Sequence, residues 1–271
     1  MPDTTTTKAN QKAPLVTEAY HAYRFRAGRV FDALSFMVRI IRETEEGSLR
    51  LAEAMINAHK VLGNEDAAER NRRIVESRDA GFVSAFDKRV PVLEELIVIS
   101  FLDAFESYFS DLLFSIFLKN PSALRSAATI TTEDALSHAS VEDLIVSVAG
   151  KRVQELSYLS LRKRIETVER LHGFRLILQD EDILKLERAV TLRNCLVHNS
   201  GVITKQAATV VGHTDTAGSV IKISGGTSVE MFELTSALVR SADERASKKF
   251  SLKRSRKAQS TRKTSVFRDL I

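Results

Sequence analysis

The chain has 271 residues and a formal net charge of +5, with 44% hydrophobic and 28% charged residues. These fractions are typical of a globular protein and exclude a fully disordered or fibrous chain. With 11 glycines and 4 prolines, the chain has few helix-breaking residues, and this favours long helices over many short strands. The single cysteine, Cys195, excludes an internal disulfide and a cysteine-based zinc site, so we expect a reducing, cytoplasmic location.

Positive charge is concentrated at the C-terminal end of the chain. Residues 248–271 hold nine lysines and arginines against Asp269, a net charge of +8, so residues 1–247 carry −3. Such a segment attracts phosphate-bearing partners independently of their nucleotide sequence. We expect a disordered basic tail at 248–271 that either contacts RNA or is only solvated. Its candidate RNA-binding side chains are Lys248, Lys249, Lys253, Arg254, Arg256 and Lys257.

The first part of the chain is expected to form an N-terminal helical extension at 15–80, preceded by a flexible leader at 1–14. Apolar residues at three- and four-residue steps predict one amphipathic helix from Tyr20 to Glu46. A second helix is expected from about Ser48 to Leu62, and an exposed, charged helix at 65–80.

The stretch from Val92 to Leu118 is apolar nearly all round, which is typical of the buried centre of a helical bundle. Its acidic residues argue against a membrane-spanning helix. A narrow polar stripe contains Asp103, Glu106, Ser107 and Ser110. Asp103 and Glu106 either reach a functional site or form structural ion pairs, and the rarity of unpaired buried acids favours the second interpretation.

The second half of the chain also predicts helices. Ser140 and Asp143 resemble a capping box that opens a helical region, with breaks expected at Gly150 and near 157–160. No strand–helix–strand alternation is present. The pattern therefore predicts an all-α chain packed as an antiparallel helical bundle.

Two later segments complete this prediction. Valines and isoleucines at 210–211 and 220–223 flank a Gly- and Thr-rich turn, and we expect them to pair as a small β-hairpin. A last amphipathic helix is expected at about 228–247, capped by Thr227 with Glu230.

The segment 181–198 carries the strongest conflict between polarity and packing. At helical spacing, one apolar stripe contains Ile183, Leu186, Val190 and Val197, and the polar side chains that flank it are Arg193, Asn194 and His198. An Arg and a His beside a packed face lose hydration, which costs free energy unless they have hydrogen-bond partners. Such a conflict is often kept because the side chains have a function. Cys195 is expected to be a packed free thiol.

The chemistry of these three side chains suits cleavage of a phosphodiester. The forked guanidinium of Arg193 matches a phosphate and its developing negative charge. The imidazole of His198 can move a proton from a ribose 2′-hydroxyl or to a leaving 5′-oxygen, and the Asn194 amide can orient either group. RNA supplies its own nucleophile, so we expect no cofactor and no metal. By spacing alone, an Arg and a His bonded to carbonyls at a helix end stay an open alternative.

The string Arg193-Asn194-Cys195-Leu196-Val197-His198-Asn199-Ser200-Gly201-Val202 resembles the signature of HEPN-domain ribonucleases. Residues 100–113 are similar to the long core helix of the RiboL-PSP-HEPN-like branch of that superfamily. The resemblance covers roughly 85–245, which suggests a HEPN-like domain at 81–247 and leaves 15–80 as an addition to it.

The resemblance implies an up-and-down bundle of HEPN type that forms a homodimer. Two Arg/His motifs would meet at the interface in one composite site, with Arg193, Asn194 and His198 catalytic. Metal-independent endoribonuclease activity leaving 2′,3′-cyclic phosphate ends follows from the same resemblance. So does a role as a toxin or antiviral defence effector, with a cognate antitoxin or defence-system partner and no membrane. Some relatives carry a Tyr shortly after the His, whereas this chain has Asn199 and Ser200.

Two other functions are compatible with the sequence. One is a non-catalytic HEPN-like module that binds RNA or a protein, with the basic tail as its main contact. The other is a helical partner of another protein, with no nucleic acid involved.

Overall fold

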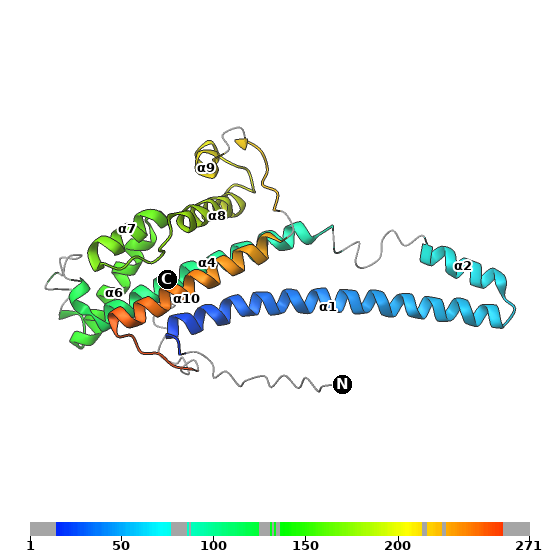
Figure 1. Ribbon diagram of the computed structural model, residues 1–271, viewed down its shortest axis with the longest axis horizontal. Helices are drawn as coiled ribbons and strands as arrows, with labels where there is room; N and C mark the ends of the chain where they lie inside the picture. The colour runs from blue at the N-terminus through cyan, green and yellow to red at the C-terminus, as the bar shows by residue number, and fades with distance from the viewer. Residues whose placement is uncertain are drawn as a thin grey trace, which may run out of the picture. The chain divides into compact units, whose positions relative to one another are not determined.

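The computed structural model describes residues 15–76, 86, 88–124, 131, 133, 136–212, 216–223 and 226–256. This part of the chain is all-helical, as the composition predicts (Figure 1). Its elements are α1 (Glu18–Val61), α2 (Glu65–Glu76), α4 (Val90–Lys119), η1 (Pro121–Leu124), α6 (Val141–Ser157), α7 (Leu161–His172), α8 (Asp180–His198), α9 (Lys205–Val211) and α10 (Thr227–Phe250). Among the described helices, none is both long and apolar enough to cross a membrane.

The described residues fall into two compact units. Unit 1 takes in residues up to 24, 105–183 and 236 onward, and unit 2 takes in residues 25–104 and 184–235. The helices α1, α4, α8 and α10 each contribute one segment to each unit. This division differs from the expected arrangement of an extension at 15–80 beside a domain at 81–247, which remains a prediction.

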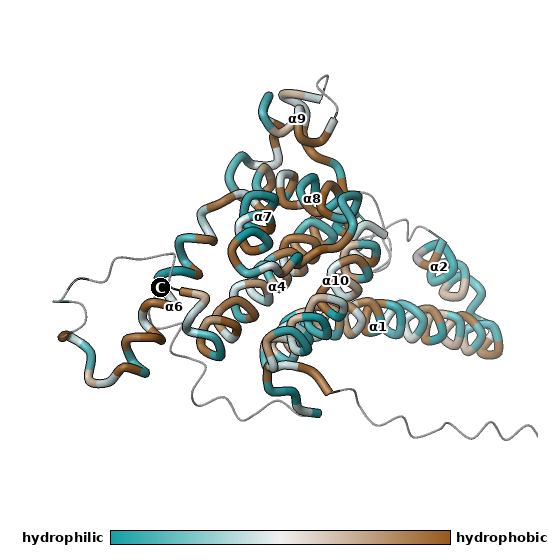
Figure 2. Tube along the Cα trace, turned by 60° about the vertical axis from the view of Figure 1, so that its left-hand side comes forward, coloured by the Kyte–Doolittle hydropathy of each residue, from teal (hydrophilic) through white to brown (hydrophobic). Residues whose placement is uncertain are grey.

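The core of unit 1 is built around the second half of α4. Tyr108, Leu112 and Phe117 are fully buried there. The Tyr108 hydroxyl donates a hydrogen bond of 3.3 Å to the carbonyl of Val239 on α10, which satisfies its polar end inside the core. Burial raises the pKa of Tyr108 well above its ordinary value. The prediction that this stretch is a buried core helix is confirmed, and Figure 2 shows its predominantly apolar trace.

The core of unit 2 uses the first half of α4 together with α1 and α10. Phe101 is 1% exposed, and its ring lies 5.2 Å from that of Phe232, which in turn stacks on Phe31 at 5.5 Å. Glu94 of α4 accepts a hydrogen bond of 2.9 Å from the backbone N–H of Ser228, so a carboxylate stabilises the first turn of α10.

The predicted break between two N-terminal helices is wrong, because α1 continues through Gly47 and Ser48. A glycine inside a helix costs about 1 kcal/mol relative to alanine, which is too little to end one. Ion pairs one turn apart are present on each side, Arg39 with Glu43 and Glu46 with Arg50.

The helix boundaries around Ser140 and Ser160 follow the sequence pattern. The Ser140 hydroxyl oxygen accepts a 3.1 Å hydrogen bond from the N–H of Asp143 and caps α6, as predicted. The predicted break near 157–160 is confirmed between α6 and α7, where Ser160 caps α7. The predicted break at Gly150 is wrong, because α6 continues through that residue.

The predicted β-hairpin is wrong. Val210 and Val211 lie in α9, which Thr204 caps at its start and Gly212 ends with a φ of 86°. Val220 makes only an isolated bridge, to Val202. The N-cap hydroxyl and the left-handed C-cap glycine favour a seven-residue helix over the strand alternation that the valines suggested.

The C-terminal helix extends further than the expected end near 247. α10 runs to Phe250, and Ser255 forms a backbone bridge with Val16, with N–H···O distances of 3.0 and 2.8 Å. The backbone N–H of Thr17 also donates to the buried carboxylate of Asp243 at 3.1 Å. Within unit 1 the residues around 16 and those around 255 are therefore joined, so the segment 248–256 is not a free tail. The expected leader at 1–14 and the tail from 257 onward lie outside the described residues.

Candidate functional site

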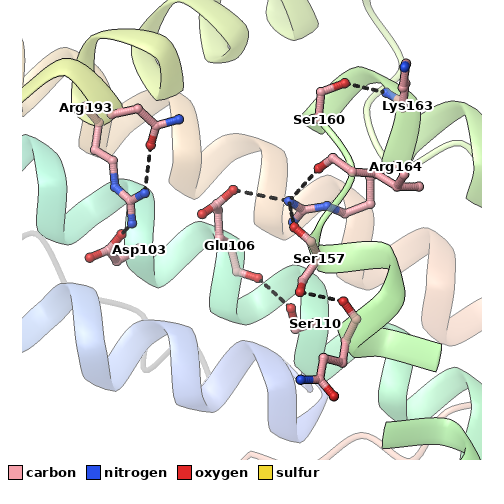
Figure 3. Close-up of polar contacts among 11 residues, drawn as sticks. Asp103, Glu106, Ser110, Ser157, Ser160, Lys163, Arg164 and Arg193 are labelled. Carbon is pink, nitrogen blue, oxygen red and sulfur yellow. Dashed lines mark hydrogen bonds and ion pairs between the residues drawn. The ribbon is translucent and has the colours of Figure 1, made fainter. Parts of the chain in front are cut away.

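The motif at 193–198 occupies the last turns of α8, within unit 2. The side chain of Arg193 is 21% exposed and points to α4, where its Nη2 donates to Asp103 Oδ1 (Figure 3). Its Nη1 donates to the amide oxygen of the neighbouring Asn194 at 3.0 Å. A half-exposed acid on the core helix thus holds the guanidinium in place. Asp103 forms an ion pair with a candidate site residue, so this contact is compatible with both interpretations of Asp103.

The Asp103 contact changes the electrostatics of the motif. The ion pair neutralises the formal charge of Arg193 locally, and Asn194 takes one more of its donors. Arg193 Nε is buried and has no hydrogen-bond partner in the structure. A guanidinium carries five N–H donors, so two bonds leave capacity for a further acceptor.

His198 is exposed at the last residue of α8. It lies five residues from Arg193, which corresponds to about 140° around the helix and about 7.5 Å along it. Among the described residues, no hydrogen bond or ion pair joins the imidazole to Arg193, Asn194 or Asp103. The structure therefore brings Arg193, Asn194 and Asp103 together, and it does not bring His198 to them.

A tight turn follows His198. Ser200 and Gly201 both have left-handed backbones, with φ of 53° and 77°. The N–H groups of Asn199 and Gly201 donate to the carbonyl of Cys195 at 2.9 and 3.0 Å, so the end of α8 is closed by the turn itself. Gly201 is required there because L side chains rarely adopt its conformation.

The chain beyond this turn folds back onto α8. Ile221 N–H donates to the carbonyl of Gly201 at 2.8 Å, and Ile203 N–H donates to that of Ser219 at 2.9 Å. The core cluster that results contains Cys195, Ile203, Ala207, Ala208 and Ile221. Cys195 is thus a buried free thiol, as predicted.

The predicted apolar stripe of this helix is wrong at one end. Ile183 and Leu186 are buried as expected, whereas Val197 is 48% exposed and Cys195 takes the buried position. On the Cys195 side, the helix is covered by Ile203, Ala207, Ala208 and Ile221, and this long-range contact could not be inferred from spacing. The side chains of Val197 and His198 are exposed.

Sequence reasoning missed Arg164, which belongs to unit 1 and is 6% exposed. Its Nη2 donates to Glu106 at 3.5 Å and to the carbonyls of Ser157 and Leu159 at 3.4 Å (Figure 3). Its guanidinium also lies 5.6 Å from the ring centroid of Phe109. Burial lowers the pKa of Arg164, while Glu106 opposes that shift. In the sequence, the acidic Glu106 within an apolar helix predicted a structural ion pair. Its partner, Arg164, could not be identified from the sequence.

The candidate RNA-binding residues lie in unit 1, and most of them are exposed. Lys248 pairs with Glu244 at 2.8 Å, and Lys249 Nζ donates to the carbonyl of Gly173 at 2.7 Å. Lys253 and Arg256 are exposed, whereas Arg254 is half-buried with an unpartnered Nε. Lys257 lies outside the described residues.

No group of three or more His, Cys, Asp or Glu side chains in the described part of the chain is placed to hold a metal ion. No protein-family model, curated protein or solved structure matches this chain.

Proposed function

We propose that this protein is a metal-independent endoribonuclease of HEPN type, acting as a homodimer. The single observation that carries the proposal is the placement of the Arg193 and His198 side chains. Both belong to the last turns of α8, yet they leave it about 140° apart, so one chain does not direct them at one phosphate. Two copies of the helix end can do so, because the Arg of one and the His of the other converge where two such ends meet.

The reaction follows from the chemistry of the two side chains. The ribose 2′-oxygen attacks the adjacent phosphorus, the bond to the 5′-oxygen breaks, and a 2′,3′-cyclic phosphate forms. Arg193 stabilises the extra negative charge of the transition state. His198 takes the proton of the 2′-hydroxyl or gives one to the leaving oxygen. Asp103 and Asn194 are positioning residues that hold the guanidinium.

The test mixes two inactive variants. Arg193→Ala and His198→Ala are each expected to abolish cleavage of labelled single-stranded RNA in the presence of a chelator. In a co-expressed heterodimer, the shared site still contains one intact Arg193 and one intact His198, contributed by different copies, so cleavage returns. Arg188→Ala is the matched control, since Arg188 is an exposed arginine on the same helix, and it keeps full activity. Failure of the mixed dimer to cleave would overturn the composite site.

The ion pair with Asp103 favours a second candidate, a non-catalytic module that binds RNA or a protein, because it neutralises the arginine that cleavage needs. In this case the basic residues 248–271 make the main contact with RNA. Removing them would abolish RNA binding in a low-salt gel shift, and no cleavage product would form with the intact chain. A toxin or defence role, with an inhibitory partner, belongs to the first candidate.

A further inference from the structure

An exposed apolar surface runs along α1, within unit 2. The exposed side of this helix from Phe25 onward carries large apolar side chains, and Phe25, Phe36 and Leu51 are 66%, 56% and 64% exposed. Apolar and polar stretches alternate along the helix (Figure 2). The face that packs inward is a different one and includes Tyr23 and Ala27, which are buried at its start. A long row of exposed apolar side chains is a common mark of an interaction site.

The exposed row has a regular period. Its positions follow steps of four, four and three residues, which is an eleven-residue repeat. We call this row the outer stripe, and it contains Phe25, Arg29, Ala33, Phe36, Ile40, Thr44, Gly47, Leu51, Met55, Ala58 and Leu62, all exposed. The average step of about 3.67 residues per turn keeps a stripe nearly straight along an α-helix. A straight stripe of this length matches another long helix.

Most of the outer stripe pairs with itself when two copies run antiparallel. A two-fold axis between Glu43 and Thr44 places opposite each other residues whose numbers add to 87, which pairs eight of the eleven stripe positions with one another. The other three, Ala33, Thr44 and Met55, face Ala54, Glu43 and Asp32. Phe36 then faces Leu51, and the bulky Ile40 faces Gly47, where a Cβ would meet nothing within 4 Å. Phe25 faces Leu62 in the same register. A large side chain opposite a small one is what close packing between two helices requires.

The size of the surface also fits a second copy. From residue 25 to residue 62 the stripe spans about 55 Å, at about 1.5 Å per residue. With a contact width of about 10 Å, a pair of stripes buries about 1,100 Å² in total, near the lower end of specific interfaces. In the single chain, the rings of Phe25 and Phe36 are covered only in part, by the guanidinium groups of Arg29 and Arg39 at 5.5 and 5.9 Å.

We propose that the outer stripe of α1 is a self-association surface that pairs two copies of this chain antiparallel, in the register in which Ile40 faces Gly47. This interface uses α1 and is separate from the helix end that carries Arg193 and His198. A chain that used both interfaces would form a tetramer rather than a dimer.

Disulfide trapping tests the register directly in the full-length chain. Ile40→Cys with Gly47→Cys places two thiols seven residues apart on one helix, about 10.5 Å, which is too far for an internal bond. We expect this variant to form a covalent dimer under mild oxidation. Ser35→Cys with Arg42→Cys has the same spacing on another exposed side of α1, and we expect it to stay monomeric on a non-reducing gel. Equal trapping in both variants, or none in the first, would overturn the proposal.

Sedimentation of the reduced protein gives a second, independent measurement. The wild-type chain is expected to have at least twice the 30.2 kDa mass of one chain. Leu51→Glu should weaken association at least about tenfold, because it brings a carboxylate against Phe36 of the other copy. Leu49→Glu is the matched control, an exposed leucine on another side of α1, and it keeps the wild-type mass. A monomeric wild-type chain at high concentration, or equal masses for the two variants, would contradict the outer stripe.

Failure of the α1 interface and failure of the nuclease proposal would give different results. If the motif also dimerises, Leu51→Glu reduces a tetramer to a dimer and leaves RNA cleavage intact. If the motif does not dimerise, the same variant reduces a dimer to a monomer. The cleavage assay with His198→Ala then tests the nuclease proposal independently.

Discussion

The Arg193 guanidinium is held by the Asp103 carboxylate, a residue 90 positions earlier in the chain. One lies on α8 and the other on α4, so the contact ties the motif helix to the core helix of unit 2. The contact also sets the orientation of the Arg193 side chain, because Asn194 holds a second nitrogen of the same group. Two hydrogen bonds from different nitrogens to different acceptors fix a guanidinium more firmly than either bond alone.

Asp103→Asn is expected to release Arg193 from its charge partner. The lost ion pair is half-exposed, so the unfolding free energy should fall by less than about 1 kcal/mol in urea titrations. RNA binding measured by fluorescence anisotropy should tighten, because an uncompensated cation is left, while cleavage should slow because the guanidinium is less well positioned. Unchanged binding and unchanged cleavage would show that Asp103 does not act on Arg193.

Arg164→Met is expected to be strongly destabilising. It leaves Glu106 and the carbonyls of Ser157 and Leu159 without their donor. Because Glu106 is 27% exposed, we expect a loss of about 2–3 kcal/mol, below the range for a fully buried pair. Urea unfolding followed by circular dichroism measures it.

The control for Arg164 is Arg152→Met, which removes the more exposed ion pair with Glu155 on α6. Its expected loss is below about 1 kcal/mol. If Arg152→Met destabilised the protein as much as Arg164→Met, burial of Arg164 would not be the reason for its effect.

Asp243 should make the stability depend on pH. Its carboxyl is buried, and burial raises its pKa from the usual 3.8, although the hydrogen bonds from Thr17 oppose that shift. The folded state therefore holds this proton more tightly than the unfolded chain does. The contribution of Asp243 to the unfolding free energy then falls as the pH rises from about 3.8 through the raised pKa, and it is fully lost above it.

Asp243→Asn removes this titration and keeps an acceptor for the N–H of Thr17. Relative to the variant, the wild-type protein should lose stability as the pH rises above about 4, as measured by urea midpoints at several pH values. A difference between the two proteins that stays constant over this range would mean that the pKa of Asp243 is not raised.

Two glycine substitutions should have opposite signs. Gly201→Ala should destabilise the protein by about 1–2 kcal/mol, because the φ of 77° is unfavourable for an L residue although the nearest atoms are 3.7 Å from its Cβ. Gly28→Ala should stabilise it by about 0.5–1 kcal/mol, since that helical position has open space around it and lies outside the outer stripe. Thermal unfolding of both variants provides the check, and a stabilising Gly201→Ala would show that the turn after His198 is not constrained.

The helices were largely predictable because they depend on local patterns. The nearly uniform apolar character of residues 92–118 identified α4 as a core helix, and Ser140 marked the start of α6 through its own hydroxyl. Where the predictions of helix boundaries failed, other local effects decided. A single glycine at position 47 costs too little to end α1, and the caps at Thr204 and Gly212 make Val210 and Val211 helical.

For the motif at 193–198, the candidate residues were predictable, but their surroundings were not, because distant parts of the chain pack against them. Chain order and residue type identified Arg193, Asn194 and His198 as candidates. They did not reveal that Ile203, Ala207 and Ile221 cover Cys195, while Val197 stays exposed. Arg164 carried no signal at all, since its burial depends on carbonyls that become available only where α6 and α7 are broken.

The sequence by itself determined which segments are helical and which residues carry charge, because helix propensity, capping and hydrophobic period act over a few neighbouring residues. The tertiary structure decided which charge meets which. Partners such as Asp103 and Arg193, or Glu106 and Arg164, are far apart in the chain, and their attraction becomes strong only after packing removes water from between them.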